Sequence, residues 1–134
     1  MSDDALTESQ AQKAAALGIG SYTQHLLLCV GPKCCSETAG LETWTFLKAH
    51  LRELARKEQI SPVEVFRTKV GCLRICSGGP IMVVYPDGVW YHSVTPAVAE
   101  RIVREHVLGG RVVQEYAFAR NPLNQSQTGG SGVA

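Results

Sequence analysis

The 134-residue sequence lacks the features of a secreted, membrane-spanning or nucleic-acid-coating protein. No apolar run approaches the roughly 18–20 residues that a transmembrane helix needs. The first ten residues, MSDDALTESQ, are acidic and polar, unlike a signal or transit peptide. The 13 basic and 12 acidic residues give a net charge of +1, without the basic excess typical of nucleic-acid-binding proteins. We therefore expect a cytoplasmic protein that binds neither membrane nor nucleic acid.

Cysteine is the unusual residue type in this sequence. Five cysteines fall in two groups, Cys29, Cys34 and Cys35 in the first and Cys72 and Cys76 in the second. An odd number in a reducing compartment argues against complete disulfide pairing. Cysteine also fills hydrophobic cores, but core-filling cysteines are not usually gathered in two loops bounded by glycine and proline. The pattern therefore indicates thiol chemistry.

The rest of the sequence predicts alternating strands and helices. HLLLCV (residues 25–30) is typical of a buried strand that ends at Gly31 and Pro32. From Leu41 the apolar residues recur with helical spacing. After two further strands, PDG (residues 86–88) indicates a hairpin turn. The remaining elements expected are strands at residues 63–70, 81–85 and 89–94, and a helix from the N-cap Thr95 to Gly109.

This order, β-α-β-β-β-α, predicts an α/β domain with a thioredoxin-like fold: a four-stranded mixed sheet with two main helices. We place the domain at residues 21–122. Residues 1–20 lack strong periodicity, and we expect a flexible segment with at most a loose helical turn. Residues 123–134 are polar and rich in glycine, and we expect a flexible tail.

In such a sheet the loop after the first strand lies beside the loop before the third, so thiolates from both groups can converge. Zinc sites commonly use C-x2-C pairs, whereas the spacings here are C-x4-C or C-x5-C and C-x3-C. These looser, unequal spacings favour an iron–sulfur cluster, in which each iron takes two sulfurs from one pair. The plant-type and Rieske spacings are absent, so we do not expect histidine ligands.

Three segments together resemble a known family: HLLLCVGPKCC, VGCLRICSGGPIMVVYPDGVWYHSVTP and RIVREHVLGGRVVQEYAF. They are similar to the thioredoxin-like [2Fe-2S] ferredoxins, which include small bacterial ferredoxins and resemble the peripheral iron–sulfur subunit of respiratory complex I. The resemblance implies one [2Fe-2S] cluster per chain, electron transfer as the activity, and a homodimer in some members.

Carried over residue by residue, the resemblance implies that Cys29, Cys72 and Cys76 are cluster ligands. The fourth ligand is Cys34 or Cys35. The C-x4-C spacing from Cys29 favours Cys34, as in the complex I subunit. A count back from Trp44, taken as the first core-facing residue of the helix, favours Cys35, which we prefer because helix packing fixes register.

The sequence therefore predicts a one-electron carrier, and not an enzyme, that shuttles electrons between a separate reductase and an acceptor enzyme. Two alternatives remain. One is a small structural zinc-binding domain with four cysteine ligands. The other is a thioredoxin-like thiol–disulfide protein using Cys72 and Cys76, although it lacks the C-x-x-C spacing at a helix N-terminus that such activity normally requires. Lys33 and Arg74 flank the cysteines, and Arg67 and Lys69 lie on the preceding strand, so we expect a basic rim that would suit an acidic redox partner.

Overall fold

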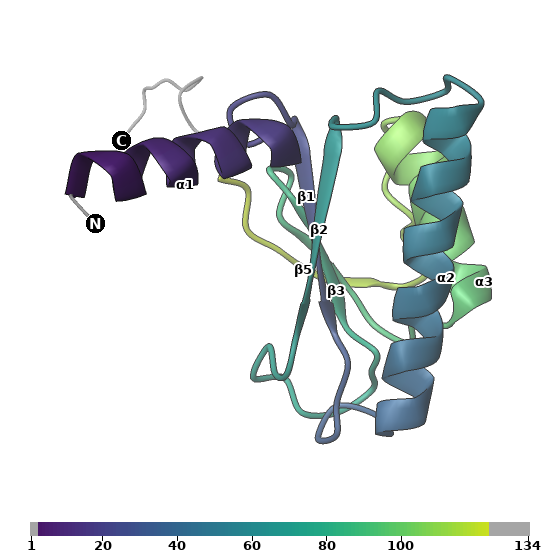
Figure 1. The fold of residues 1–134 in the computed structure, drawn as a ribbon. Helices are drawn as coiled ribbons and strands as arrows, with labels where there is room; N and C mark the ends of the chain where they lie inside the picture. The colour runs from purple at the N-terminus through teal and green to yellow at the C-terminus, as the bar shows by residue number, and fades with distance from the viewer. Residues whose placement is uncertain (1–2, 124–134) are drawn as a thin grey trace, which may run out of the picture.

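The computed structural model describes residues 3–123, which form a five-stranded mixed sheet in the order β2-β1-β3-β4-β5. Strands β1 and β2 are parallel, and every other neighbouring pair is antiparallel. Helices α2 and α3 cover one face of the sheet (Figure 1). The predicted order of strands and helices is therefore present. The strands are β1 (Gln24–Cys29), β2 (Val65–Val70), β3 (Met82–Tyr85), β4 (Val89–Tyr91) and β5 (Ala117–Arg120).

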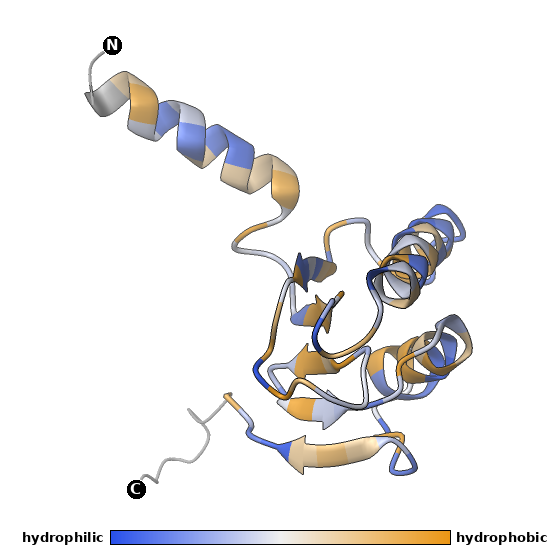
Figure 2. Cartoon of the chain, turned by 90° about the horizontal axis from the view of Figure 1, so that it is seen from below, coloured by the Kyte–Doolittle hydropathy of each residue, from blue (hydrophilic) through white to orange (hydrophobic). Residues whose placement is uncertain are grey.

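Two elements were not predicted. The expected sheet had four strands, but β5 adds a fifth by pairing antiparallel with β4. Residues 1–20 were expected to be flexible, yet Asp3–Leu17 form helix α1, which extends away from the sheet and the other helices (Figure 2). The boundaries of the domain at residues 21 and 122 stay a prediction, and the predicted tail lies outside the described residues after Leu123.

Helix α2 (Glu37–Arg56) connects the parallel strands and begins directly after the first cysteine group. Ser36 is its N-cap, and the Ser36 hydroxyl accepts a hydrogen bond from the Ala39 amide at 3.1 Å. The helix starts four residues before the predicted Leu41, which is 40% exposed and does not belong to the core. Leu47, Leu51 and Leu54 are buried as the apolar spacing predicts.

The second predicted helix is present as α3 (Pro96–Arg101) and its π-helical continuation η1 (Ile102–Leu108). Thr95 is the N-cap, as predicted, and its hydroxyl accepts from the Val98 amide at 3.3 Å. Gly109 follows the last helical residue. The apolar residues of these helices pack on the helix-facing side chains of the sheet, and each large one that is fully buried stabilises the fold by about 1.5–3 kcal/mol.

A buried hydrogen-bonded network joins η1 to the β3–β4 hairpin. His106 is 2% exposed. Its Nδ1 lies 2.8 Å from the Tyr91 hydroxyl, and its Nε2 lies 2.7 Å from Asp87 Oδ2. The Val113 amide donates to the Tyr91 oxygen at 3.1 Å. Burial raises the pKa of Tyr91. His106 is therefore a hydrogen-bonded core residue and not a solvent-exposed one.

None of the helices within residues 3–123 combines the length and apolar character needed to cross a bilayer.

Candidate functional site

The two cysteine groups lie at one edge of the sheet, where β1 and β2 end and β3 begins. Cys29 is the last residue of β1, and the loop after β1 carries Cys34 and Cys35 into α2. Cys72 and Cys76 lie in the loop between β2 and β3. The parallel pairing of Cys29 with Val70 sets the two loops side by side. The expected convergence of these loops is therefore present.

Cys29 and Cys34 form the inner half of the site. Their sulfur atoms are joined as a disulfide, and their exposed fractions are 0% and 6%. They share a small apolar cluster with Ile81, against which Leu73 and Trp90 pack. These contacts fix both side chains within the protein. The sequence did not single out Leu73, Ile81 or Trp90, because an apolar residue in or beside a strand carries no signal for a neighbouring thiol.

Cys72 and Cys76 form the outer half and are exposed, with their sulfur atoms 4.0 Å apart. The Arg74 amide donates to the Cys72 sulfur at 3.1 Å. Arg74 and Cys76 have φ angles of 75° and 62°, in the left-handed region that side chains rarely adopt. This turn directs both thiols of the C-x3-C loop to one side, and it places a backbone donor on a sulfur.

Two contacts connect the inner half to the ends of the outer loop. The Cys29 sulfur lies 3.9 Å from the Gly71 carbonyl oxygen. The Gly79 amide donates to the Cys34 carbonyl oxygen at 2.8 Å. A Cβ on Gly79 would lie 2.7 Å from that oxygen, closer than side chains pack. The glycine of the SGGP segment therefore allows the two loops to touch.

Cys35 is separate from both pairs. Its thiol is free and partly buried, and its sulfur lies 3.7 Å from that of Cys34. Burial raises the pKa of the Cys35 thiol, and a hydrogen bond with the Gly40 backbone opposes this effect. The count that favoured Cys35 began at Trp44, whereas α2 already buries Gly40 and Thr43 before it.

The described cysteine sulfurs lie in two pairs and not around a single point. Within residues 3–123, no group of three or more cysteine, histidine or acidic side chains is gathered closely enough to hold one metal ion. The sulfurs are instead arranged as two pairs in touching loops. Two pairs of thiolates match a unit in which each of two irons takes two sulfurs.

The histidines do not take part in the site. His106 belongs to the buried network, and His25 Nε2 lies 2.8 Å from the Thr68 hydroxyl. His50 stacks on Phe46, with ring centroids 5.1 Å apart. His92 Nδ1 lies 2.8 Å from the Ser93 hydroxyl. Each histidine therefore contacts residues other than the cysteines, and the ligand set stays a prediction.

The surface around the outer pair is basic. Lys33, Lys69 and Arg74 are exposed, and neither cysteine-bearing loop contains an acidic residue. None of the three forms an ion pair within the described part of the chain. We call these three residues the basic rim.

The fold and the paired thiols define a small thioredoxin-like protein with a cysteine-based redox or metal site. No family model matches the chain. The chain is 36% identical over 94 residues to the 2Fe-2S ferredoxin of Clostridium pasteurianum, a match covering 67% of this chain and 90% of that protein. It is 30% identical over 104 residues to the 2Fe-2S ferredoxin of Aquifex aeolicus, which covers 72% and 90%.

Solved structures agree. The thioredoxin-like [2Fe-2S] ferredoxin from Aquifex aeolicus superposes with a TM-score of 0.64 at 27% sequence identity, covering 78% of this chain and 98% of that one. A second structure, of the wild-type form of that ferredoxin, gives a TM-score of 0.63 and covers 74% and 99%. The chain therefore belongs to the thioredoxin-like [2Fe-2S] ferredoxin family, whose members are iron–sulfur electron carriers. The predicted fold class and family are confirmed, and the similarity to the complex I subunit stays a prediction.

Proposed function

We propose that this chain binds one [2Fe-2S] cluster through the thiolates of Cys29, Cys34, Cys72 and Cys76, and that it carries single electrons between a reductase and an acceptor enzyme. The observation that carries the proposal is the arrangement of two pairs of cysteine sulfurs in two loops that touch through Gly79. The Cys29–Cys34 disulfide must first take up two electrons from a reductant such as a cellular thiol, which gives the two thiolates that bind iron. Family membership supports the choice of cluster. When bound, a [2Fe-2S] cluster supplies the one-electron chemistry.

The choice of Cys34 as fourth ligand replaces our preference for Cys35. It is supported by the contact of the Cys29 and Cys34 sulfurs and by the hydrogen bond that ties the Cys34 backbone to Gly79. Cys35 remains the alternative, since its sulfur lies 3.7 Å from that of Cys34.

The protein has two tasks at this site. It holds the inner pair of thiolates in a dry, packed environment, where Ile81 and Trp90 exclude water. It also supplies hydrogen bonds to the outer pair, of which Arg74 N–H to Cys72 Sγ is one. Such hydrogen bonds stabilise the more negative, reduced state and raise the reduction potential.

We propose that redox partners dock on the side of the protein where Cys72 and Cys76 are exposed. The basic rim would attract an acidic partner surface to this edge and raise the rate of encounter. Ile75, 40% exposed in the same loop, offers an apolar contact between the charges. The family resemblance also suggests a homodimer, which a mass measurement in solution would test.

The proposal is tested on the purified protein. We expect two iron atoms and two inorganic sulfides per chain, a red-brown colour that bleaches with dithionite, and a rhombic electron paramagnetic resonance signal after reduction. A colourless protein that contains one zinc per chain would contradict the proposal and favour the structural zinc domain. A metal-free protein with a reducible disulfide would favour the thiol–disulfide alternative instead.

A further inference from the structure

A small cavity lies between helix α2 and strand β2, which is the edge strand of the sheet. Its volume is about 160 Å³. No carboxylate lines it, and five of its seven lining residues are apolar. The lining residues are Leu51, Arg52, Ala55, Ile60, Pro62, Val65 and Arg67.

The two arginines of this cavity have no anionic partner. Arg67 Nε is buried and lacks a hydrogen-bond partner among the described residues. The Arg67 guanidinium carbon lies over the Trp44 ring, 5.7 Å from its centre. Arg52 is exposed, and neither arginine forms an ion pair within residues 3–123.

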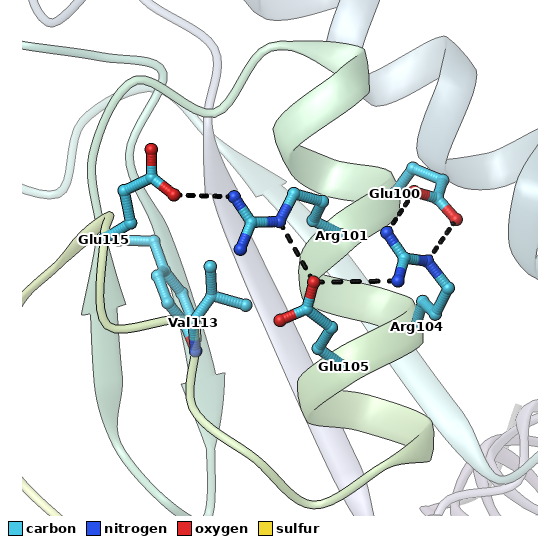
Figure 3. Close-up of polar contacts among 7 residues, drawn as sticks. Glu100, Arg101, Arg104, Glu105, Val113 and Glu115 are labelled. Carbon is cyan, nitrogen blue, oxygen red and sulfur yellow. Dashed lines mark hydrogen bonds and ion pairs between the residues drawn. The ribbon is translucent and has the colours of Figure 1, made fainter.

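Three arginines elsewhere in the protein, Arg56, Arg101 and Arg104, form ion pairs. Arg101 binds Glu105 at 3.0 Å and Glu115 at 2.8 Å, and Arg104 binds Glu100 at 3.0 Å (Figure 3). The two cavity arginines differ from these three because neither has a carboxylate partner within residues 3–123.

Without a bound anion, the two unpaired arginines at the cavity lower the stability of the fold. A buried donor without an acceptor loses its bonds to water and gains none in return. Burial lowers the pKa of Arg67, and the nearby charge of Arg52 lowers it further, so the cavity disfavours positive charge. A bound anion that accepts from the Arg67 guanidinium would offset both charges. Guanidinium groups bind carboxylates and phosphates through paired N–H donors.

We propose that the cavity between α2 and β2 binds a small organic anion, with its carboxylate or phosphate between Arg52 and Arg67 and a short hydrocarbon part against Leu51, Ile60 and Val65. A volume of 160 Å³ is that of about five water molecules in the liquid, which limits the ligand to a head group with a few carbon atoms. The site does not depend on the cysteine loops or on the proposed electron transfer.

Isothermal titration of the purified holoprotein, at constant ionic strength, tests this site with three probes of four carbon atoms each. Butyrate and butyl phosphate carry the two head groups, and butyramide is the uncharged counterpart. We expect one-to-one saturable binding of at least one anion and none of butyramide. The stronger anion identifies the head group. Absence of saturable heat with both anions, or equal binding of butyramide, would overturn the proposal.

Variants then locate the site. Arg52→Gln changes an exposed side chain without an ion pair, so the fold should be kept, and we expect at least tenfold weaker binding. Arg67→Lys keeps the charge but removes Nε–H, and it should weaken binding to a similar extent. Arg104→Gln is the matched control on α3/η1 and should bind as the unchanged protein does. Equal weakening by Arg52→Gln and Arg104→Gln would show a general charge effect and contradict the site.

Discussion

Cys29 and Cys34 lie inside the protein, whereas Cys72 and Cys76 lie on an exposed loop at the same edge of the sheet. The inner pair is fixed by a strand end and by packing on Ile81. The outer pair is shaped by a turn with left-handed residues and a backbone hydrogen bond to sulfur.

The difference assigns separate tasks to the two halves of the site. A buried ligand has little room to be replaced, because its neighbours are packed at the density of an organic crystal. An exposed loop can adjust, and it is also the surface that another protein can reach. We therefore interpret the inner pair as the anchor of the cluster and the outer pair as the route for electrons.

The largest expected effect is the loss of an inner ligand. Cys29→Ser should abolish the cluster, because the buried hydroxyl has apolar neighbours and the strand cannot move to suit it. Cys76→Ser should lower the iron content less, since its loop can present another oxygen or sulfur. Iron per chain and visible absorbance measure both. If Cys76→Ser lost more iron per chain than Cys29→Ser, the interpretation of the inner pair as the anchor of the cluster would be wrong.

The second test separates the two adjacent cysteines. Cys34→Ser should lose the cluster, whereas Cys35→Ser should keep two irons per chain with an unchanged spectrum. The reverse result would restore Cys35 as the ligand and extend the inner pair outward to a half-buried side chain. If both variants keep the cluster, neither assignment of the fourth ligand is right.

The buried His106 network, at the other end of the sheet, provides a control that should change stability but not cluster binding. His106→Leu removes two hydrogen bonds and leaves the Tyr91 hydroxyl buried with one partner fewer. We expect a loss of about 1–3 kcal/mol in the free energy of unfolding, with iron content unchanged. His50→Leu, a half-exposed ring on α2, should change that free energy by less than about 0.5 kcal/mol. Urea unfolding of the holoproteins gives both values, and equal destabilisation would remove the network's special role.

Sequence reasoning reached the elements whose signals are local. Thr95 and Pro96 with Gly109 define a helix start and end, and Asp87 with Gly88 defines a hairpin turn, because caps and turns depend on a few backbone groups. Helix α1 was missed because Asp3–Leu17 has no apolar stripe, so only helix propensity supports it. Strand β5 was missed because it is short, exposed and held by its partner β4.

For the candidate site too, only the local features could be predicted from the sequence. The spacing of the cysteines and their loops identified both groups, but their burial could not be read from the sequence. The choice between Cys34 and Cys35 depends on where α2 begins, and Ser36 was not considered as its N-cap. An N-cap serine directly after two adjacent cysteines is the sequence signal for where this helix begins.

The smallest expected effect concerns access to the outer pair. Arg74→Glu and Lys33→Glu should slow oxidation of the reduced protein by ferricyanide, an anion, by roughly two- to fivefold at low ionic strength. The same variants should speed oxidation by cobalt hexaammine, a cation, because the substitution makes the local potential at the exposed loop more negative. The difference should shrink in 0.5 M salt, where the Debye length is about 4 Å.

Arg111→Glu is the matched control for the basic rim. Arg111 is exposed and follows η1, whose His106 contacts Asp87 at the hairpin turn, the end of the sheet away from the cysteines. All three variants change the net charge by the same amount, so an effect of total charge would appear in each. Stopped-flow rates that change in Arg74→Glu and Lys33→Glu, but not in Arg111→Glu, would locate electron exit at the outer pair. Equal changes of the oxidation rate in all three variants would show an effect of total charge, and would contradict electron exit at the outer pair.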